Sequence, residues 1–366
     1  WAMTPAALRH QAYGSEAELL VIEGAMGVLD GAGTASTGSA AQTAEILGLP
    51  LVLVIDVAKT GASAVLPVAG LRALHPEVPL AGVILNRVAS PRHARILEHA
   101  FAGLDVPILG QLPRDPDLTL PERHLGLVQA SAHLALEAFL ARVGGVLARN
   151  ADVAAIAAAC LPVTAGTMPA LLPPLGQRIA VASDTACAFA YPHVLEGWRS
   201  QGAEVLPFSP LANAAPDPRA DAIFLPGGYP ELHAGTLAAA ARFRSAMETT
   251  QARSYGECGG YMTLGEGLID AQGTRHRMLG LLPLETSFER RKRTLGYRRL
   301  TPGPGAPWKT PLNAHEFHYA TILSEPENTP RLFQAQDADG TKLPDMGLSD
   351  GRVSGSFAHV IALNQA

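Results

Sequence analysis

Short, continuous apolar runs alternate with helical patterns along the first third of the chain. The apolar runs cover residues 18–25, 51–57, 80–88 and 106–113. Runs of this length are typical of strands that are covered on both faces. Helical patterns cover residues 1–15, 36–48, 62–74 and 91–103. This alternation predicts right-handed crossovers and a parallel sheet with helices on both of its faces.

A second alternation of the same kind begins at Arg178, after a stretch rich in alanine, glycine and proline. Its predicted strands cover 178–183, 204–208, 222–225 and the run from 254, with helices near 190–201 and 236–249. Beyond residue 277 the pattern indicates short strands and loops. We therefore expect an α/β protein with two doubly wound domains, residues 1–140 and 177–366, joined by a helix and linker over 141–176.

Composition limits the classes of protein to which this chain can belong. A chain of 366 residues with 48% hydrophobic content can bury two cores. The net charge of −5 argues against nucleic acid as a partner. Cys160, Cys187 and Cys258 show no paired spacing, which fits neither a disulfide framework nor a zinc site and suits a reducing cytoplasm. No apolar stretch approaches the length of a membrane span, so we expect no membrane partner.

The segment from Ser254 to Gly265, Ser-Tyr-Gly-Glu-Cys-Gly-Gly-Tyr-Met-Thr-Leu-Gly, is the strongest chemical signal. A cysteine followed by two glycines after an apolar run predicts a sharp strand-to-helix turn that presents the thiol at a helix start, where a thiolate is favoured. A lone cysteine is more often a buried packing residue. Two further segments favour a nucleophile, namely Pro226-Gly-Gly-Tyr-Pro upstream and the run around His359 near the end of the chain.

These three segments resemble the class I glutamine amidotransferase domain of cobyrinate and hydrogenobyrinate a,c-diamide synthases. The resemblance implies that Cys258 attacks the side-chain amide of L-glutamine while His359 accepts the thiol proton and passes it to ammonia. It also implies that the amides of Gly228 and Gly259 form the oxyanion hole. Many class I domains have a glutamate two residues after the histidine. In this chain Ile361 occupies that position, so we expect a cysteine–histidine pair whose orienting group is not identified.

In the first half, Glu23 and Asp30 are separated by seven positions in the glycine-rich run Ile-Glu-Gly-Ala-Met-Gly-Val-Leu-Asp-Gly, which begins at Ile22. Two such carboxylates can hold Mg²⁺ and place a substrate carboxylate near a phosphate, or they can be a turn residue and a surface charge. The run resembles the magnesium-binding stretch of the same family, whose N-terminal domain is similar to dethiobiotin synthetase. The resemblance implies that Glu23 is a magnesium ligand and that Asp30 lies beside the carboxylate being phosphorylated.

Three further residues follow predicted strands and match nucleotide-facing positions of that ATP-dependent fold. Lys59 could contact phosphate or be a solvated loop lysine, and Asn86, followed by Arg87, could pair with the adenine edge or end a strand in a turn. The phosphate loop Gly-x-x-x-x-Gly-Lys-[Ser/Thr] is not present, since none of the four lysines follows a glycine. We expect the sequence to begin inside this domain, after the strand that carries that loop.

The segment from Ser287 to Arg299 carries six cations in thirteen residues. Such a run is either a solvated face or a binding surface for a polycarboxylate, because guanidinium pairs bidentately with carboxylates. The resemblance implies that the corrin-binding cleft includes Arg290, Arg291, Arg293, Arg298, His315, Glu316 and His318. The spacing of His315 and His318 does not suggest zinc, because residues three apart on a strand face opposite sides.

The resemblance covers residues 18–361 and implies an enzyme of cobalamin biosynthesis. We expect an ATP- and Mg²⁺-dependent, glutamine-hydrolysing amidoligase that converts the a and c carboxylates of hydrogenobyrinic or cobyrinic acid to amides. The stretch Leu-Gly-Tyr-Arg-Arg, which ends at Arg299, is more similar to the hydrogenobyrinate enzymes. The alternatives are a glutaminase or corrin-binding fragment without ligase activity, and cobyric acid synthase. The sequence is also compatible with a homodimer.

Overall fold

The computed structural model describes residues 1–15, 17–118, 135–327 and 329–364. The described residues form two compact units. The N-terminal unit comprises Leu8–Asp30 and Ser39–Gly166, and the C-terminal unit comprises Trp1–Ala7, Gly31–Gly38 and Thr167–Ala366. Part of the predicted first domain, residues 119–134, lies outside the described residues.

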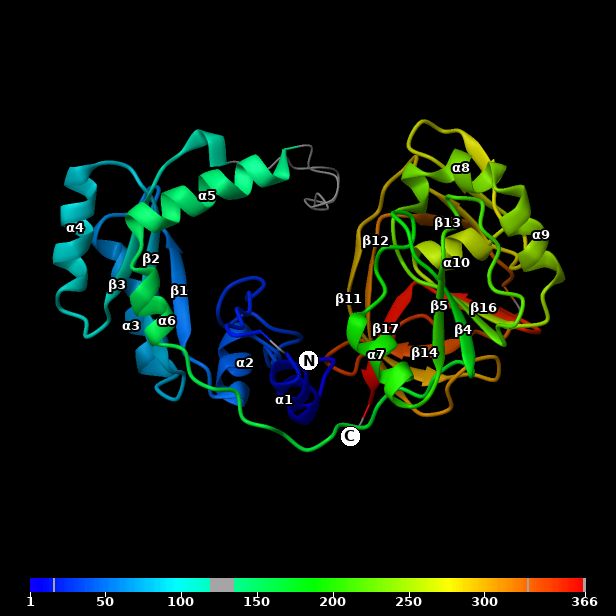
Figure 1. The fold of residues 1–366 in the computed structure, drawn as a ribbon, viewed down its shortest axis with the longest axis horizontal. Coiled ribbons are helices and arrows are strands. Elements are labelled where there is room, and N and C mark those ends of the chain that lie inside the picture. The colour runs from blue at the N-terminus through cyan, green and yellow to red at the C-terminus, as the bar shows by residue number, and fades with distance from the viewer. Residues whose placement is uncertain (16, 119–134, 328, 365–366) are drawn as a thin grey trace. The chain divides into compact units, whose positions relative to one another are not determined.

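The N-terminal unit contains a parallel sheet with strand order β1-β2-β3, and its elements are labelled in Figure 1. The strands are β1 (Leu51–Asp56), β2 (Leu80–Val88) and β3 (Ile108–Pro113). The helices are α1 (Pro5–Tyr13), which spans a boundary between the units, α2 (Ala40–Leu47), η1 (Ala62–Val65), α3 (Leu66–Leu74), α4 (Pro91–Phe101), η2 (Pro116–Leu118), α5 (Leu136–Asn150) and α6 (Val153–Ala158). Ser39 caps α2 and Gly48 ends it in the left-handed conformation, within the helical pattern expected over residues 36–48.

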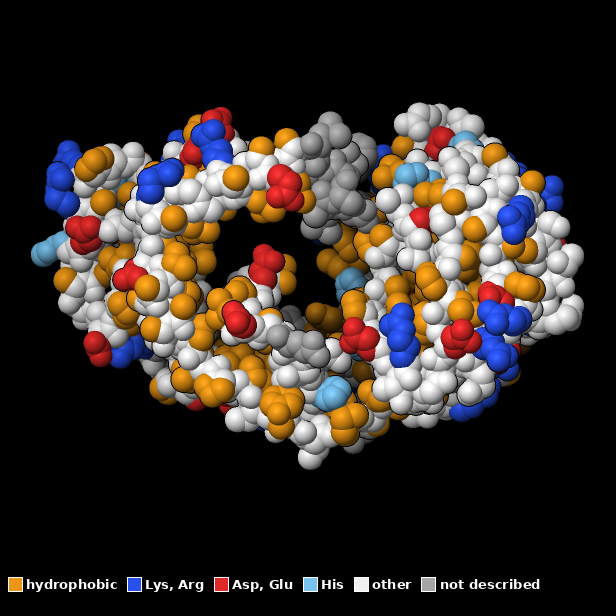
Figure 2. All heavy atoms as spheres, in the orientation of Figure 1, with side chains coloured by type: hydrophobic (Ala, Val, Ile, Leu, Met, Phe, Trp, Pro, Cys, Tyr) orange, Lys and Arg blue, Asp and Glu red, His pale blue; other side chains and the backbone are white. Residues whose placement is uncertain are grey.

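The core of this unit lies between the sheet and helices α3 and α4. Val68 of α3 and Leu97 of α4 are fully buried against Val83 and Leu85 of β2. Hydrophobic side chains are also exposed on the face of this unit seen in Figure 2. The exposed large apolar residues of the unit include Val54, Leu66 and Leu74. In the described part of the chain, no helix has the length and apolar character needed to cross a membrane.

The C-terminal unit is built on a six-stranded sheet of order β15-β16-β7-β6-β4-β5, in which only the edge strand β15 is antiparallel. The strands are β4 (Arg178–Ala182), β5 (Glu204–Phe208), β6 (Ala222–Leu225), β7 (Arg253–Glu257), β15 (Leu348–Asp350) and β16 (Val353–Ser356). The helices are α7 (Pro192–Ser200), η4 (Pro230–Leu232), α8 (Ala234–Ala239), α9 (Ala241–Thr249) and α10 (Gly259–Leu264).

Alternate residues of the central strands face two different cores. Ala180 and Ala182 join the core that includes α8, α9 and α10, whereas Ile179 and Val181 join the core that includes α7. Because side chains alternate along a strand, both faces of this sheet are covered. The predicted doubly wound architecture is therefore confirmed in this unit.

Two smaller sheets complete the C-terminal unit. The first has the order β14-β11-β12-β17 and supplies Leu312, Ala314 and Val360 to the α7 core. Its strands are β11 (Thr294–Pro302), β12 (Leu312–His318), β14 (Phe333–Gln336) and β17 (Ala358–Leu363). The second has the order β13-β10-β8-β9, with strands β8 (Gly267–Ile269), β9 (Arg275–Arg277), β10 (Glu285–Ser287) and β13 (Thr321–Ser324).

The strand predicted over residues 18–25 does not form. No strand is assigned there, and Val21 is 80% and Met26 is 85% exposed. An apolar run becomes a buried strand only where a neighbouring strand accepts its backbone hydrogen bonds. In the described part of the N-terminal unit, β1 is paired with β2 and with no other strand. Residues 18–25 therefore lie outside the sheet, and the strand predicted there is wrong.

Candidate active site

Cys258 lies at the turn between β7 and α10. Its backbone has φ 46° and ψ −105°, a conformation that side-chain-bearing residues rarely adopt. The turn needs the glycines that follow, because a Cβ on Gly260 would lie 1.9 Å from the backbone oxygen of Leu225 in β6. The strained cysteine and the close approach of α10 to the sheet match the strand-to-helix turn predicted for this segment.

The thiol of Cys258 is 4% exposed and donates to the carbonyl oxygen of Phe317, with a sulfur–oxygen distance of 3.7 Å. Burial raises its pKa to about 12, and the charge of Glu231 acts in the same direction, whereas the N–H of Gly259 lowers it. Desolvation therefore outweighs the helix start that was expected to favour a thiolate. In the described state Cys258 is a neutral thiol.

His359 lies on β17, directly opposite His315 of β12. Its ring is buried, and burial lowers its pKa to about 4, assisted by the charges of His315 and His318. A neutral imidazole is the form that can accept a proton from a thiol. The state of His359 thus suits a general base.

The glycine loop after β6 brings the cysteine and histidine segments to one place. A Cβ on Gly227 would lie 2.1 Å from Cε1 of His359, so only glycine leaves room for the imidazole. A Cβ on Gly259, next to the cysteine, would lie 2.9 Å from the nitrogen of Gly228. The two glycines predicted to form an oxyanion hole are therefore neighbours, and the histidine lies against the same loop.

Among the described residues, no hydrogen bond joins Nδ1 of His359 to a third residue of a triad. This nitrogen is buried. The rings of Phe189 and Tyr191 lie at centroid distances of 6.4 and 6.3 Å. Ile361 contributes only its backbone oxygen, which contacts Nε2 of His193 at 2.8 Å. Packing by aromatic rings and by the Gly227 backbone therefore holds the imidazole.

Four residues beside the pair were not predicted as site residues. Gly227 contacts the imidazole, and Tyr191 flanks it. Glu231 affects Cys258 electrostatically, and its own pKa is raised to about 7 by burial. Glu257, which directly precedes the cysteine, accepts the N–H of Val360 at 3.0 Å. Only their positions within or next to the two motifs could have indicated Gly227, Glu231 and Glu257, because neither glycine nor glutamate at such sites carries a periodicity signal. Tyr191 lies outside both motifs.

The residues predicted to line the substrate cleft fall into two groups. Arg290, Arg291 and Arg293 are exposed. Arg298 is instead largely covered, with 11% of its side chain exposed, and its Nε donates to Oε2 of Glu316 at 2.7 Å. This guanidinium is paired with an internal carboxylate, unlike those of the three exposed arginines.

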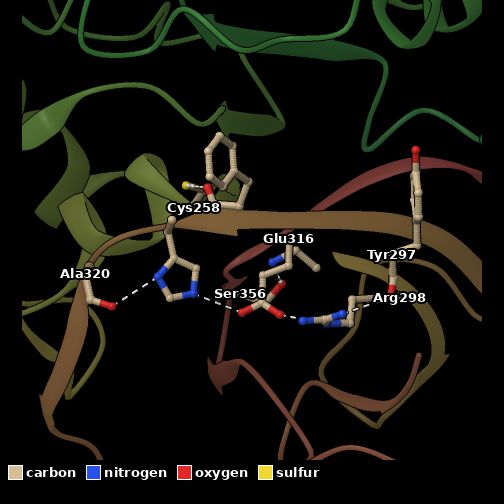
Figure 3. Close-up of polar contacts among 9 residues, drawn as sticks. Cys258, Tyr297, Arg298, Glu316, Ala320 and Ser356 are labelled. Carbon is tan, nitrogen blue, oxygen red and sulfur yellow. Dashed lines mark hydrogen bonds and ion pairs between the residues drawn. The ribbon is translucent and has the colours of Figure 1, made fainter. Parts of the chain in front are cut away.

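His318 completes this buried network, which Figure 3 shows. Its Nε2 lies 2.9 Å from Oε1 of Glu316, and its Nδ1 lies 3.1 Å from the carbonyl oxygen of Ala320. The hydrogen bonds to His318 and Arg298 hold the pKa of Glu316 below its usual value, although burial opposes them. Within the described residues, no group of three or more His, Cys, Asp or Glu side chains could hold a metal.

The N-terminal unit has a cavity of about 500 Å³ at the ends of β1 and β2. Its lining consists of Asp56, Ala58, Lys59, Thr60, Arg87 and Arg114. Lys59 and Arg87 were predicted here, whereas Arg114 was not, since a single arginine after a strand is an ordinary surface residue. Nε of Arg87 donates to Asp56 at 2.8 Å, and Arg87 has a φ of 66°. Three cations around one cavity suit a phosphate chain.

Asn86, by contrast, is not among the residues that line this cavity. Its backbone oxygen accepts the N–H of Val57 at 2.9 Å.

Glu23 and Asp30 are exposed in the irregular segment that precedes α2. Oδ2 of Asp30 accepts the N–H of Gly27 at 3.0 Å, which closes a short turn. Carboxylate oxygens are suitable ligands for Mg²⁺, which commonly takes one or two carboxylates together with phosphate and water. The donor chemistry of this segment fits Mg²⁺.

The buried cysteine and histidine at a glycine loop, on a doubly wound sheet, define a glutamine amidotransferase. Residues 178–366 match the CobB/CobQ-like glutamine amidotransferase domain family, and residues 4–122 match an AAA domain family. The chain belongs to the hydrogenobyrinate a,c-diamide synthase family.

Relatives with that name come from several bacteria. The one from Brucella abortus is 55% identical over 99% of this chain and 84% of its own length. The one from Rhizobium meliloti is 51% identical over 100% and 86%, and the one from Rhodobacter capsulatus is 49% identical over 97% and 83%. A crystal structure of a glutamine amidotransferase from Thermotoga maritima has a TM-score of 0.34 and 14% identity over 50% of this chain and 75% of that one.

Proposed function

We propose that this chain is a glutamine-dependent carboxylate amidoligase of cobalamin biosynthesis, which amidates the a and c carboxylates of hydrogenobyrinic acid. The observation that carries the proposal is Cys258, held at φ 46° beside a glycine loop that also receives His359. The family relationship supplies the substrate, because relatives at 49–55% identity carry the name of that reaction. The same names favour hydrogenobyrinic acid over cobyrinic acid, and diamide synthesis over cobyric acid synthesis.

The glutaminase reaction uses the C-terminal unit. The Cys258 sulfur attacks the side-chain amide carbon of glutamine while His359 takes the thiol proton and then gives it to the departing ammonia. The amides of Gly228 and Gly259 stabilise the negative charge on the amide oxygen. Water then hydrolyses the glutamyl thioester, which releases glutamate and restores the thiol. Because both groups begin neutral, the proton moves from sulfur to nitrogen only as the carbon–sulfur bond forms.

The N-terminal unit activates the acceptor carboxylate. Lys59, Arg87 and Arg114 bind the phosphates of ATP in the cationic cavity, and Asp30 lies beside the carboxylate that receives the γ-phosphoryl group. Asn86 contacts the adenine edge. Mg²⁺ held by Glu23 would neutralise phosphate charge during the transfer. Ammonia then displaces phosphate from the acyl phosphate and gives the amide.

The exposed arginines supply the contacts to the corrin. Arg290, Arg291 and Arg293 are free to pair with the peripheral carboxylates of a polycarboxylate ring. Burial has the largest effect on the pKa of Glu231 and raises it. A backbone hydrogen bond and the charge of Arg291 lower it. This coupling supports a position of the cationic segment close to the glycine loop of the glutaminase site.

A comparison of glutamine and ammonia as nitrogen donors tests the proposal. The Cys258→Ala variant should lose glutamine-dependent amidation and glutaminase activity, yet retain amidation supported by ammonium salts, because ammonia bypasses the thiol. Cys160→Ala is the matched control, since Cys160 is exposed and lies in the N-terminal unit. Retention of glutaminase activity by Cys258→Ala would refute the assignment. Lack of ATP-dependent amidation in the unchanged chain, with glutaminase intact, would instead favour a glutaminase without ligase activity.

A further inference from the structure

Glu257 precedes the nucleophile, and its carboxyl group is buried at the end of β7. The residue is 3% exposed, and its Oε1 accepts the backbone N–H of Val360 at 3.0 Å. Val360 directly follows His359. The side chain next to Cys258 is therefore bonded to the backbone next to the histidine.

This bond joins strands of two different sheets. Cys258 follows β7, an inner strand of the six-stranded sheet, whereas His359 lies on β17, the edge strand of the sheet with order β14-β11-β12-β17. In the described sheets, β17 pairs with β12 and not with β7. The distance between sulfur and imidazole is therefore set by contacts between sheets, and misplacement by about 1 Å can cost about 10²-fold in rate.

Two further hydrogen bonds hold the short segment between β16 and β17 next to the cysteine. The N–H of Cys258 donates to the oxygen of Ser356 at 2.8 Å, and Oγ of Ser356 accepts the N–H of Ala358 at 3.2 Å. These bonds fix the end of β16 and the start of β17. Glu257 alone, among the described side chains that belong to β7, is bonded to β17 itself.

The protonation state of Glu257 agrees with a role as a neutral acceptor. Burial raises its pKa to about 8, although the Val360 N–H and the Tyr255 hydroxyl lower it. Near neutral pH the group is therefore largely the uncharged acid. A negative charge on Glu257 would oppose formation of a thiolate on Cys258, because that charge raises the pKa of the thiol. The acid form avoids this cost and keeps a carbonyl oxygen for Val360.

We propose that Glu257 is a positioning residue for glutamine hydrolysis, which ties the strand that carries His359 to the strand that presents Cys258. The inference rests on the proposed roles of these two residues. Its action requires a hydrogen-bond acceptor of the length of a glutamate side chain and does not require a charge. Glutamine at this position should therefore replace glutamate, whereas alanine should not.

Steady-state glutaminase kinetics of the full chain test this inference with two variants. Glu257→Ala should lower kcat by about 10²-fold with KM for glutamine within about threefold, because the pair is misaligned while the binding contacts remain. Glu257→Gln should stay within about threefold of the unchanged protein, because its amide oxygen accepts the same N–H. Glu285→Ala is the control, a glutamate of β10 that pairs with Arg275 and should leave both constants unchanged.

A second readout separates positioning from general structural damage. The rate at which iodoacetamide alkylates Cys258, followed by mass spectrometry of its peptide, should fall about tenfold or more in Glu257→Ala and recover in Glu257→Gln, while the melting temperature of Glu257→Gln matches that of the unchanged protein within about 2 °C. Equal loss in both variants would overturn the acceptor role, and unchanged kcat in Glu257→Ala would overturn the inference altogether. Inactivity of Cys258→Ala and His359→Ala alongside full activity of Glu257→Ala would leave the proposed function intact, whereas activity of Cys258→Ala would refute that function first.

Discussion

The imidazole of His359 occupies the space that a side chain on Gly227 would need. The ideal Cβ position on Gly227 lies 2.1 Å from Cε1 of the ring and 3.0 Å from each ring nitrogen. The glycine is therefore required by the histidine and not by its own backbone conformation, since Gly227 is not among the glycines with positive φ. The first glycine of the loop makes room for the imidazole, and the second is the one whose amide we propose as an oxyanion-hole donor.

We expect Gly227→Ala to displace His359 and to lower glutaminase kcat by about 10²-fold or more. The new methyl group meets a buried ring that cannot retreat into solvent. Gly235→Ala, in α8, is the matched control, because its Cβ would make only ordinary contact with His276 at 3.8 Å. Glutaminase assays of both variants decide the matter. Normal kcat in Gly227→Ala would show that the imidazole does not act from the position described.

Arg298 and Arg290 should respond differently to substitution by alanine. Arg298→Ala leaves the buried carboxylate of Glu316 with one partner fewer, and we expect it to destabilise the unit by about 3–5 kcal/mol. Arg290→Ala removes an exposed charge, so it should change stability by about 0.5 kcal/mol or less and raise KM for the corrin. Urea unfolding and amidation kinetics measure the two effects. A stable Arg298→Ala variant with a raised KM for the corrin would show that Arg298 contacts the substrate.

The stability of the C-terminal unit should depend on pH through Glu257. Its pKa is about 8 in the folded state, above the ordinary value of 4.5, so the folded protein holds a proton that the unfolded chain releases. This contribution is complete below pH 4.5 and is lost as the pH rises to 8. The melting temperature of the unchanged protein should therefore fall relative to that of Glu257→Gln between pH 5 and pH 8, by more than about 2 °C. Parallel curves for the two proteins would contradict the raised pKa.

The cationic cavity of the N-terminal unit should determine the affinity for ATP. Lys59→Ala and Arg114→Ala each remove one charge that faces the phosphates, and we expect each to raise KM for ATP about tenfold with little change in glutaminase activity. Arg149→Ala, in the last turn of α5, is the control, because Arg149 is not among the lining residues. Unchanged KM in both cavity variants would place the nucleotide elsewhere.

Local sequence signals predicted the elements well where packing follows from periodicity. The strands β1, β2 and β3, the helix α2 and the turn at Cys258 all form within the ranges where they were expected. These features depend on residues close together in the chain: apolar runs, a serine and a glycine at helix ends, and glycines beside a nucleophile. The helix predicted near 236–249 is divided into α8 and α9 at Ala240, which is the cap between them.

Apart from those that the family resemblance implied, contacts between distant segments were not predicted. The irregular course of residues 18–25 depends on whether a sheet edge is free to pair, which the run itself does not record. The pairing of Arg298 with Glu316 depends on the register of β11 against β12, where Arg298 lies opposite Ala314. The bond from Glu257 to Val360 spans 103 positions, and no pattern near either residue indicates it.

The burial of Cys258 has a chemical consequence for the resting protein. Peroxide oxidises thiolates far faster than thiols, so a sulfur whose pKa is raised to about 12 is a poor target for it. The Cys258 thiol is therefore oxidised to sulfenic acid only slowly while no glutamine is bound. The same dry surroundings keep His359 neutral, which is the form that can accept the thiol proton.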